Sequence, residues 1–229
     1  FNRSAMHNNL KQFATKAWRR PVTDEETKRL IRFIQLAREQ GDSPEVGTKT
    51  AYKAVLISPH FLFRIEQNPT NKDGLISEWE LASRLSYFLW STMPDEELFK
   101  LAREGKLREA GVLETQVKRM LADPKARALG QNFAGQWLNI RSLSGFSPDP
   151  KRFPTFTARL RNDMIRETEL FFEHVVREDR SLLDLLVGNY SFLNERLARH
   201  YKIPDVKGEE FRKVELDGVQ RGGILTHAS

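Results

Sequence analysis

The chain has 229 residues, of which 39% are hydrophobic and 30% are charged, a composition typical of a globular protein rather than a disordered one. It contains no cysteine, which excludes disulfides, thiolate metal sites and haem attached through C-x-x-C-H. The net charge is +6, but 37 basic residues are interleaved with 31 acidic ones. We therefore expect local ion pairs and no nucleic-acid partner, which would need a concentrated basic face.

No apolar run approaches the roughly 20 residues needed to span a bilayer, so we expect no membrane span. The first residue is Phe1 rather than methionine. We expect the chain to be a fragment of a longer multidomain protein whose targeting signals lie elsewhere.

Three helices are predicted at the start of the chain, the first over residues 1–20. Thr23 followed by Glu26 is a capping-box signature and predicts the start of the second helix. Ser43 before Pro44 is typical of an N-cap followed by proline in the first turn, and predicts the third.

A wide apolar helix is predicted over residues 76–94. Ser77 and Glu80 form a further capping box, and Pro94 is expected to stop or redirect the helix. A helix this apolar should be largely buried and should organise the core. Its apolar surface comprises Trp79, Ala82, Leu85, Tyr87, Phe88, Leu89 and Trp90.

Helices are predicted through most of the second half as well. A heavy apolar stripe precedes an irregular proline-rich loop at 142–154, and a long helix follows over 157–178. Ser181 with Asp184 predicts a capping box for a short helix, and residues 192–201 mark a further helix. The stripe consists of Leu129, Phe133, Trp137 and Ile140.

Only in residues 211–216 do apolar and polar residues alternate as in a β-strand. A lone strand needs a partner, which a segment missing from this chain would supply. We therefore predict an all-α fold, a bundle-like array of helices with at most one short strand or hairpin near the C-terminus.

Five histidines are present, and none stands in H-E-x-x-H or another compact metal-ligand spacing, so no metal site is predicted. We expect His174 to be a satisfied, partly buried side chain and His200 to be a cation favoured by a helix C-terminus. Glu167 and His174 share a helix face, but an E-x-x-H pair would need a glutamate in place of Phe171, which excludes the di-iron signature. Arg221 with the two glycines after it predicts a tight bend.

His60 is the most interesting candidate ligand. Residues 58–59, Ser-Pro, predict a kink or a helix restart that would hold the imidazole in one direction. As an axial or distal haem ligand, His60 would need a pocket and a partner for its second nitrogen. Together with Arg64, and with Trp90 as a further member, it forms our candidate haem edge, for a haem supplied by another module.

Six segments of the chain occur in a familiar order: R-R-P-V-T-D-E-E (19–26), S-P-H-F-L-F-R (58–64), E-L-A-S-R-L-S-Y-F-L-W-S-T-M-P-D-E-E-L (80–98), R-E-D-R-S-L-L-D-L-L (177–186), F-L-N-E-R-L-A-R-H-Y (192–201) and R-G-G-I-L-T-H-A-S (221–229). Together they closely resemble the planctomycete-type domains of unknown function found in large secreted proteins that also carry cytochrome c modules. The resemblance covers nearly the whole chain.

The resemblance implies three consecutive modules. Residues 1–67 correspond to a helical module of the domain-of-unknown-function 1595 type, 75–204 to a central helical module of the 1592 type, and 205–229 to the start of a truncated module of the 1588 type. The polar cluster at 68–74 would separate the first two. The family also implies export to the periplasm or cell exterior, and neighbouring haem-c or carbohydrate-binding-like modules. It supplies no catalytic residues, and His227 stands where the family often has glutamine, which makes it a poor candidate for a shared ligand.

Two functional hypotheses follow. The favoured one is a non-catalytic helical scaffold or interaction module that positions haem-c or glycan-binding modules of the same secreted protein. It predicts exposed apolar surface at the truncated ends of the chain and no polar-lined pocket. The alternative is part of a periplasmic haem-c redox enzyme, peroxidase-like or oxygenase-like, in which His60 and Arg64 line the haem edge. Neither places a cofactor within this chain. A third, weaker option, a polyanion or cell-surface binder, would need the basic residues to converge on one face.

Overall fold

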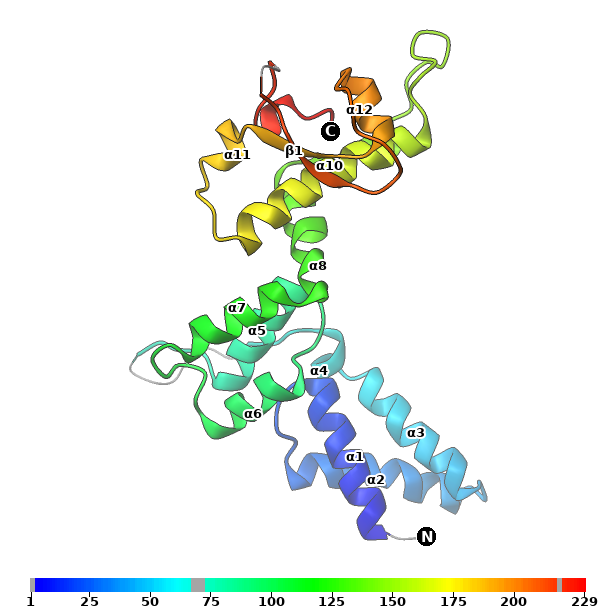
Figure 1. The fold of residues 1–229 in the computed structure, drawn as a ribbon. Coiled ribbons are helices and arrows are strands. Elements are labelled where there is room, and N and C mark those ends of the chain that lie inside the picture. Colours follow the sequence, from blue (N-terminus) through cyan, green and yellow to red (C-terminus); the bar gives the residue numbers. More distant parts are fainter. Residues whose placement is uncertain (1–2, 67–72, 218–219) are drawn as a thin grey trace. The chain divides into compact units, whose positions relative to one another are not determined.

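The structure is a computed structural model that describes residues 3–66, 73–217 and 220–229 (Figure 1). Helices dominate, and regular β-structure in the described part of the chain is one pair of short strands, which confirms the predicted all-α fold class. The chain divides into two compact units, the first formed by Phe1–Phe88 with Thr92–Gln116 and the second by Leu89–Ser91 with Val117–Ser229. Among the described residues, no helix is long and apolar enough to cross a membrane. The predicted turn at 68–74 lies largely outside the described residues.

Four helices open the first unit, and the starts of the second, third and fourth match signals in the sequence. The Thr23 hydroxyl accepts the Glu26 backbone N–H at 3.2 Å, and the Glu26 carboxylate accepts the Thr23 N–H at 2.9 Å, so the predicted capping box is confirmed. Ser43 caps the third helix through the Val46 N–H, and a short fourth helix confirms the predicted restart. The helices are α1 (Arg3–Trp18), α2 (Asp24–Glu39), α3 (Pro44–Leu56) and α4 (Pro59–Leu62).

The first three helices share one apolar core. Gly47 allows α3 to approach α2 closely, because a Cβ added there would lie 3.0 Å from the Cα of Ile34. The Trp18 indole N–H donates to the buried carbonyl of Val55 at 3.1 Å, which satisfies the polar atom of this large side chain. The buried members of the core are Leu10, Ala14, Trp18, Val22, Leu30, Ile34, Ala51 and Val55.

Arg19 fixes the segment that contains α4. Its side chain is buried, and its guanidinium donates to the carbonyl oxygens of His60 at 2.7 Å and Phe63 at 2.9 Å. It also donates to the Tyr87 hydroxyl at 3.2 Å. The last carbonyls of a helix have no partner within the helix, and here one side chain supplies it. Arg19 thereby sets the backbone position of the predicted ligand, His60.

The helix predicted over 76–94 is α5 (Glu78–Trp90). The Ser77 hydroxyl accepts the Glu80 N–H at 3.2 Å, and the Glu80 carboxylate accepts the Ser77 N–H at 2.7 Å, which confirms the capping box. The helix ends at Trp90 rather than at Pro94, because Ser91 adopts a left-handed φ of 53°.

The prediction that α5 is largely buried is correct for one face only. Ala82, Ser86, Leu89 and Trp90 are buried, whereas Phe88 is 55% exposed, so the aromatic residues do not all enter a core. The next helix is α6 (Glu96–Glu104), which Asp95 caps through the Leu98 N–H at 3.0 Å and which Gly105 ends in the left-handed conformation. The helix after it is α7 (Val112–Ala122).

The four residues of the predicted stripe from Leu129 to Ile140 do not share one buried face, so this prediction is wrong. Leu129 and Ile140 are buried, but Phe133 is 43% and Trp137 is 59% exposed. The reason is a π-helical turn, which adds one residue to a turn and rotates the following residues to another face. The elements here are η1 (Pro124–Ala126), α8 (Arg127–Leu129), the π-helical η2 (Gly130–Ala134), α9 (Gly135–Trp137) and η3 (Ile140–Gly145).

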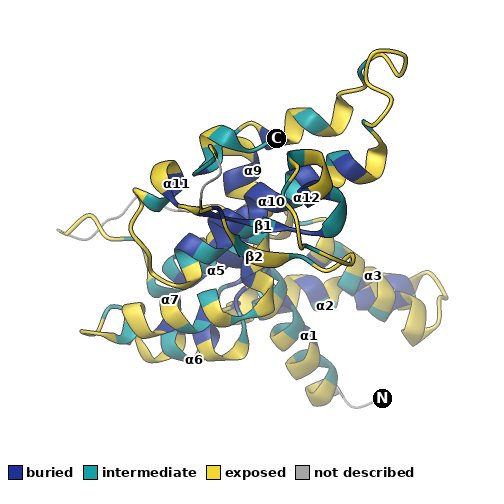
Figure 2. Ribbon diagram, turned by 45° about the horizontal axis from the view of Figure 1, so that its top comes forward, coloured by how far each residue is buried: buried dark blue, intermediate teal, exposed yellow. Residues whose placement is uncertain are grey.

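The long predicted helix is α10 (Ala158–Arg177), which runs through the centre of the second unit and is capped by Thr157. Its expected apolar residues are all buried: Leu160, Met164, Phe171, Phe172 and Val175. The elements that follow are α11 (Asp184–Val187), β1 (Tyr190–Leu193), α12 (Glu195–Tyr201), β2 (Arg212–Glu215) and η4 (Ile224–Thr226). Figure 2 shows buried residues concentrated on α10 and β1.

Two local predictions in this region are wrong. β2 pairs antiparallel with β1 in the register Tyr190↔Glu215 to Leu193↔Arg212, so the partner strand lies within the chain and takes the first two residues assigned to a helix. Ser181 does not form a capping box, because its hydroxyl accepts from the Leu183 N–H while the Asp184 carboxylate pairs with Arg180.

Candidate functional site

A buried carboxyl group lies at the centre of the second unit. Glu167, near the middle of α10, is only 1% exposed. Its Oε1 accepts the Ser191 hydroxyl of β1 at 2.6 Å, and its Oε2 accepts the Tyr201 hydroxyl of α12 at 2.5 Å. A buried charge is costly unless it is paired, so this carboxyl is the most chemically distinctive group of the unit.

Residues 221–229 close over the same carboxyl. The Thr168 hydroxyl hydrogen-bonds His227 Nδ1 at 2.8 Å and the Ser229 hydroxyl at 2.6 Å, and the Ala228 N–H donates to the Tyr201 hydroxyl at 2.8 Å. His227 Nε2 lies 3.9 Å from Glu167 Oε1 and has no hydrogen-bond partner among the described residues. The result is a compact polar cluster inside an otherwise apolar core.

Burial controls the protonation of the cluster. It raises the pKa of Glu167 to about 7, against the opposing effect of the hydrogen bonds from Ser191 and Tyr201. Burial, assisted by the positive charge of Arg221, lowers the pKa of His227 to about 4. Burial and the neighbouring Glu167 carboxyl raise the pKa of Tyr201. Near neutral pH, therefore, His227 and Tyr201 are uncharged and Glu167 is partly protonated.

Glycines bring residues 221–229 to this position. Gly223 has a φ of 61°, and a Cβ added there would lie 2.3 Å from the Leu186 carbonyl oxygen. Its N–H donates to the Gly188 carbonyl at 2.9 Å, and the Arg221 guanidinium lies 3.8 Å from the centre of the Tyr201 ring. The sequence predicted a tight bend here, and the structure contains one.

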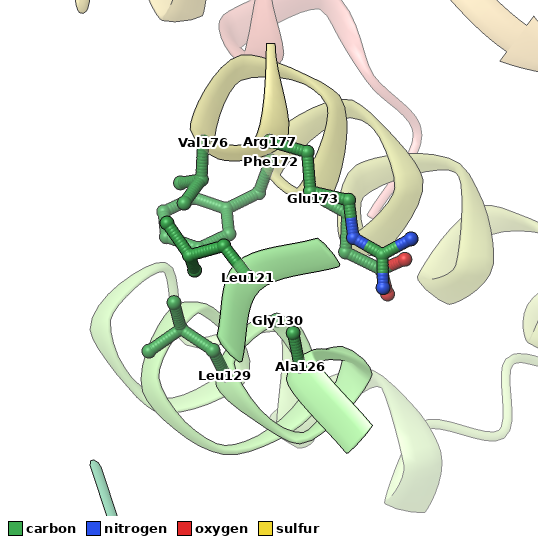
Figure 3. A pocket seen from close by; sticks show the side chains of 8 residues that line it. All are labelled: Leu121, Ala126, Leu129, Gly130, Phe172, Glu173, Val176 and Arg177. Carbon is green, nitrogen blue, oxygen red and sulfur yellow. The ribbon is translucent and has the colours of Figure 1, made fainter. Parts of the chain in front are cut away.

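A second polar cluster lies beside the π-helical turn. Arg166 donates to the Glu169 carboxylate at 2.9 Å and to the Glu173 carboxylate at 2.8 Å, and a Cβ on Gly130 would lie 3.1 Å from Glu173. The adjoining pocket has a volume of about 10 Å³, about the space of one water molecule. Figure 3 shows four large apolar side chains together on one side, those of Leu121, Leu129, Phe172 and Val176, and the ends of Glu173 and Arg177 on the other. This pocket is too small for a substrate.

A wider polar groove lies on the surface of the second unit. One part, of about 330 Å³, is lined by α10, α12 and Glu209, and an adjoining part, of about 190 Å³, by α12 with its N-cap Asn194 and by residues 208–209. The expectation that this chain has no polar-lined pocket is therefore wrong. The charges in the groove balance, and this balance does not provide the basic face that a polyanion binder needs. The groove is lined by Arg159, Asn162, Asp163, Asn194, Glu195, Arg196, Arg199, Gly208 and Glu209.

The two residues predicted for a haem edge both lie in the first unit. The half-buried His60 ring packs on Trp18, with 5.2 Å between ring centroids. Burial, assisted by the charge of Arg20, lowers the pKa of His60, so its imidazole is neutral at pH 7. The Arg64 guanidinium lies over the Tyr87 ring, 4.8 Å from its centre.

Trp90, the third member of that hypothesis, lies in the second unit instead. It is 3% exposed, and its indole N–H donates to the Met120 carbonyl at 2.8 Å, so Trp90 is a core residue. Among the described residues, no group of three or more histidine, cysteine or acidic side chains is placed to hold a metal ion.

Two other histidine predictions need correction. His174 is half-buried between the Tyr190 and Phe192 rings, but its Nε2 has no hydrogen-bond partner among the described residues, so it is not fully satisfied. Burial, assisted by the charge of Arg221, lowers the pKa of His200, so the predicted cation at that position is wrong.

A family model described as "Protein of unknown function (DUF1592)" matches residues 76–203, more than half of the chain. The chain belongs to the DUF1592 family. A second model, "Protein of unknown function (DUF1595)", matches residues 5–66. These matches confirm the resemblance to the two domain types. No curated protein and no solved structure matches the chain.

Only part of the cluster around Glu167 lies within the residues that the DUF1592 model matches. Glu167, Ser191 and Tyr201 lie within the DUF1592 range, whereas His227 lies after it. The sequence contains one indication that Glu167 is buried: it stands at helical spacing between Met164 and Phe171, two apolar residues of α10. The resemblance points away from His227 as a shared ligand, because the family often has glutamine at this position, and no local pattern relates His227 to Thr168, which lies 59 residues away in the sequence.

Proposed function

We propose that this DUF1592 chain is a non-catalytic interaction module, which docks neighbouring modules of the same polypeptide through an exposed apolar surface. The observation that carries the proposal is a group of large aliphatic side chains on and beside α11. They are exposed by between 51% and 80%, although soluble proteins usually bury such residues. We call this group the α11 patch; it consists of Leu182, Leu183, Leu186, Val187 and Leu225.

The α11 patch is supported by packing and by an ion pair. α11 packs against α10 and η4, and Leu185 between the exposed leucines is buried. Arg180 pairs with Asp184 and lies over the Tyr190 ring at 5.4 Å, which ties the start of α11 to β1. Figure 2 shows the exposed colour on part of α11 and on the residues just before it. A fixed apolar surface loses little conformational entropy on binding, which favours docking.

The first unit carries a similar surface. Ile57 is 72%, Leu62 61% and Phe63 63% exposed, and Arg19 holds the backbone of this stretch in place. Two exposed apolar surfaces on one chain suit a module that contacts more than one neighbour. The groove of balanced charges does not by itself suggest a reaction, and the buried carboxyl is closed to solvent.

The family resemblance supports a choice of neighbours. We propose that the parent protein is secreted or periplasmic and that the docked modules are haem-c or glycan-binding modules. The start of a 1588-type module at residues 205–229, like the boundaries 1–67 and 75–204, belongs to the same proposal.

The double substitution Leu182→Glu with Val187→Glu in the full-length parent tests the docking role. Charges on the α11 patch should weaken docking, so limited proteolysis should cut the parent at the junctions of this module at least about tenfold faster, since each buried Leu or Val contributes about 1.5–3 kcal/mol. Phe153→Glu is the matched control, because Phe153 is 56% exposed and lies in the loop before α10. Equal cleavage of the double variant and the wild-type parent would refute the docking role.

A second candidate function is the haem edge built from His60 and Arg64. The observation that favours it is the neutral imidazole of His60, the form that binds a haem iron. One face of this ring is already occupied by Trp18, and Arg64 is engaged with Tyr87, so the residues fit a haem edge only in part. His60→Ala in the parent should shift the haem spectrum if this alternative holds; an unchanged spectrum supports the interaction module.

A further inference from the structure

The segment that contains α4 turns its polar groups inwards and its large apolar side chains outwards. The His60 ring packs on Trp18, and the carbonyl oxygens of His60 and Phe63 accept from the buried Arg19 guanidinium. Four large apolar side chains of the same stretch are exposed by between 52% and 72%, although soluble proteins usually bury such residues. We call this group the α4 patch; it consists of Ile57, Leu62, Phe63 and Ile65.

The backbone beneath the α4 patch is held in place by hydrogen bonds. The Ser58 hydroxyl caps α4 by accepting the His60 N–H at 3.3 Å, and the Phe63 N–H donates to the Pro59 carbonyl at 2.9 Å. Arg19 adds its bonds to the two carbonyl oxygens named above. The patch is therefore already ordered before anything covers it, which reduces the entropy lost on binding.

The charged residues around the α4 patch have one sign. Residues 46–65 contain Lys49, Lys53 and Arg64 but neither aspartate nor glutamate. The Ile57 N–H donates to the Lys53 carbonyl at 3.0 Å, so Lys53 lies one helical turn from the patch, and both Lys53 and Arg64 are exposed. Residues 1–66 as a whole contain twelve basic and seven acidic residues, a net charge of +5 in a chain whose total is +6. The positive charge of the chain is thus concentrated in the part that carries the α4 patch.

We propose that the α4 patch binds the surface of a lipid bilayer that contains anionic lipids. The four apolar side chains enter the boundary between headgroups and acyl chains, and Lys53 and Arg64 contact lipid phosphates. An anionic bilayer presents an apolar layer directly beneath a layer of negative charge, which complements both features of this surface. The proposal concerns the first unit alone, so it stands or falls separately from the docking role of the α11 patch.

Sedimentation of the whole chain with lipid vesicles tests the proposal. The chain should bind vesicles of phosphatidylcholine in which about one quarter of the lipid is phosphatidylglycerol. It should bind vesicles of phosphatidylcholine alone at least about tenfold more weakly, because each basic residue near an anionic surface contributes about fivefold to the affinity. A chain that stays in the supernatant with both kinds of vesicle would overturn the proposal.

The double substitution Leu62→Ser with Phe63→Ser removes apolar surface and leaves the charge unchanged. It should weaken binding to the mixed vesicles at least about tenfold, because two large side chains no longer enter the lipid. Phe146→Ser with Phe153→Ser is the matched control, since these aromatic residues of the second unit are 54% and 56% exposed, and it should bind as the wild type does. If the first double variant also bound as the wild type does, the α4 patch would not be the contact.

The double substitution Lys53→Gln with Arg64→Gln tests the charged residues in the same assay. It should weaken binding to the mixed vesicles at least about tenfold and leave the weak binding to phosphatidylcholine vesicles unchanged. Unchanged affinity for the mixed vesicles would contradict the contact of these two residues with lipid phosphates.

Hydrogen exchange of the wild-type chain locates the contact without any substitution. Residues 57–65 should exchange more slowly when the mixed vesicles are added, whereas α10 should exchange at the same rate with and without them. Slower exchange of residues 57–65 in the full-length parent in the absence of lipid would show that a protein module covers the α4 patch, and would overturn the proposal.

Discussion

Single side chains determine the least expected features of this molecule. Arg19 and Glu167 are both buried, charged residue types, yet their environments differ. Arg19 donates to backbone carbonyls and to a hydroxyl, whereas Glu167 lies in a closed core with two hydroxyl donors and a neutral histidine nearby. The first is stabilised as a charge, and the second is driven towards its neutral form.

Replacing Arg19 with alanine should lower the free energy of unfolding by about 3 kcal/mol, because hydrogen bonds from a charged group contribute about 1.5–3 kcal/mol each and buried carbonyls lose their donor. Chemical denaturation followed by circular dichroism measures the change. Arg32→Ala, at an exposed position of α2, is the control and should change the stability by less than about 0.5 kcal/mol. A similar small effect for Arg19→Ala would contradict the role given to Arg19.

At the scale of elements, local signals predict helix starts and contacts between distant segments determine the rest. The capping boxes at Thr23 and Ser77 were predicted correctly, because both partners lie within one turn. The π-helical turn was not, because it depends on how Gly130 packs against α10 rather than on residue periodicity. The pairing of β1 with β2 was missed for a similar reason, since α12 separates the strands in the chain.

The contact of η4 with α11 depends on one glycine. Gly223→Ala should destabilise the second unit by about 2 kcal/mol or more, since alanine is strained at a φ of 61° and its Cβ would collide with the Leu186 carbonyl. Gly145→Ala is the control, because a Cβ there meets nothing within 4 Å, and its stability should change by less than about 0.5 kcal/mol. Thermal unfolding of both variants checks this; equal melting temperatures would show that the close approach is not needed.

For the whole molecule, the sequence was sufficient for the fold class and the domain family but not for the buried cluster. Composition and helical periodicity predict an all-α protein, and the quoted segments identify its domain types. The cluster around Glu167 joins residues of α10, β1, α12 and residues 221–229, which no local pattern relates. The exposure of the α11 patch is also a tertiary property, because it depends on which neighbouring segments cover α11 and not on the residues of α11 alone.

The shifted pKa values of Glu167 and His227 make the free energy of unfolding depend on pH, and the two contributions have opposite signs. The raised pKa of Glu167 stabilises the folded chain fully below pH 4.5, and this contribution is lost as the pH rises through about 7. The lowered pKa of His227 gives a contribution that is complete above pH 6.5 and is lost as the pH falls through about 4. The two slopes should cancel between about pH 4.5 and 6.5.

Glu167→Gln removes the contribution of Glu167 to the pH dependence of the free energy of unfolding. The free energy of unfolding of the wild type minus that of the variant should therefore fall by about 1.4 kcal/mol per pH unit between about pH 4.5 and 7. Urea denaturation of both proteins at several pH values measures the difference. A difference that does not vary with pH would mean that Glu167 ionises equally in the folded and unfolded states.

The proposal that this chain is an interaction module is tested most directly by hydrogen exchange at the α11 patch, compared between the isolated chain and the full-length parent. Docking should slow the exchange of residues 182–187 at least tenfold in the parent and leave the exposed loop at 146–153 unchanged. Equal exchange of residues 182–187 in the two proteins would show that no neighbouring module covers the α11 patch and would contradict the proposed function.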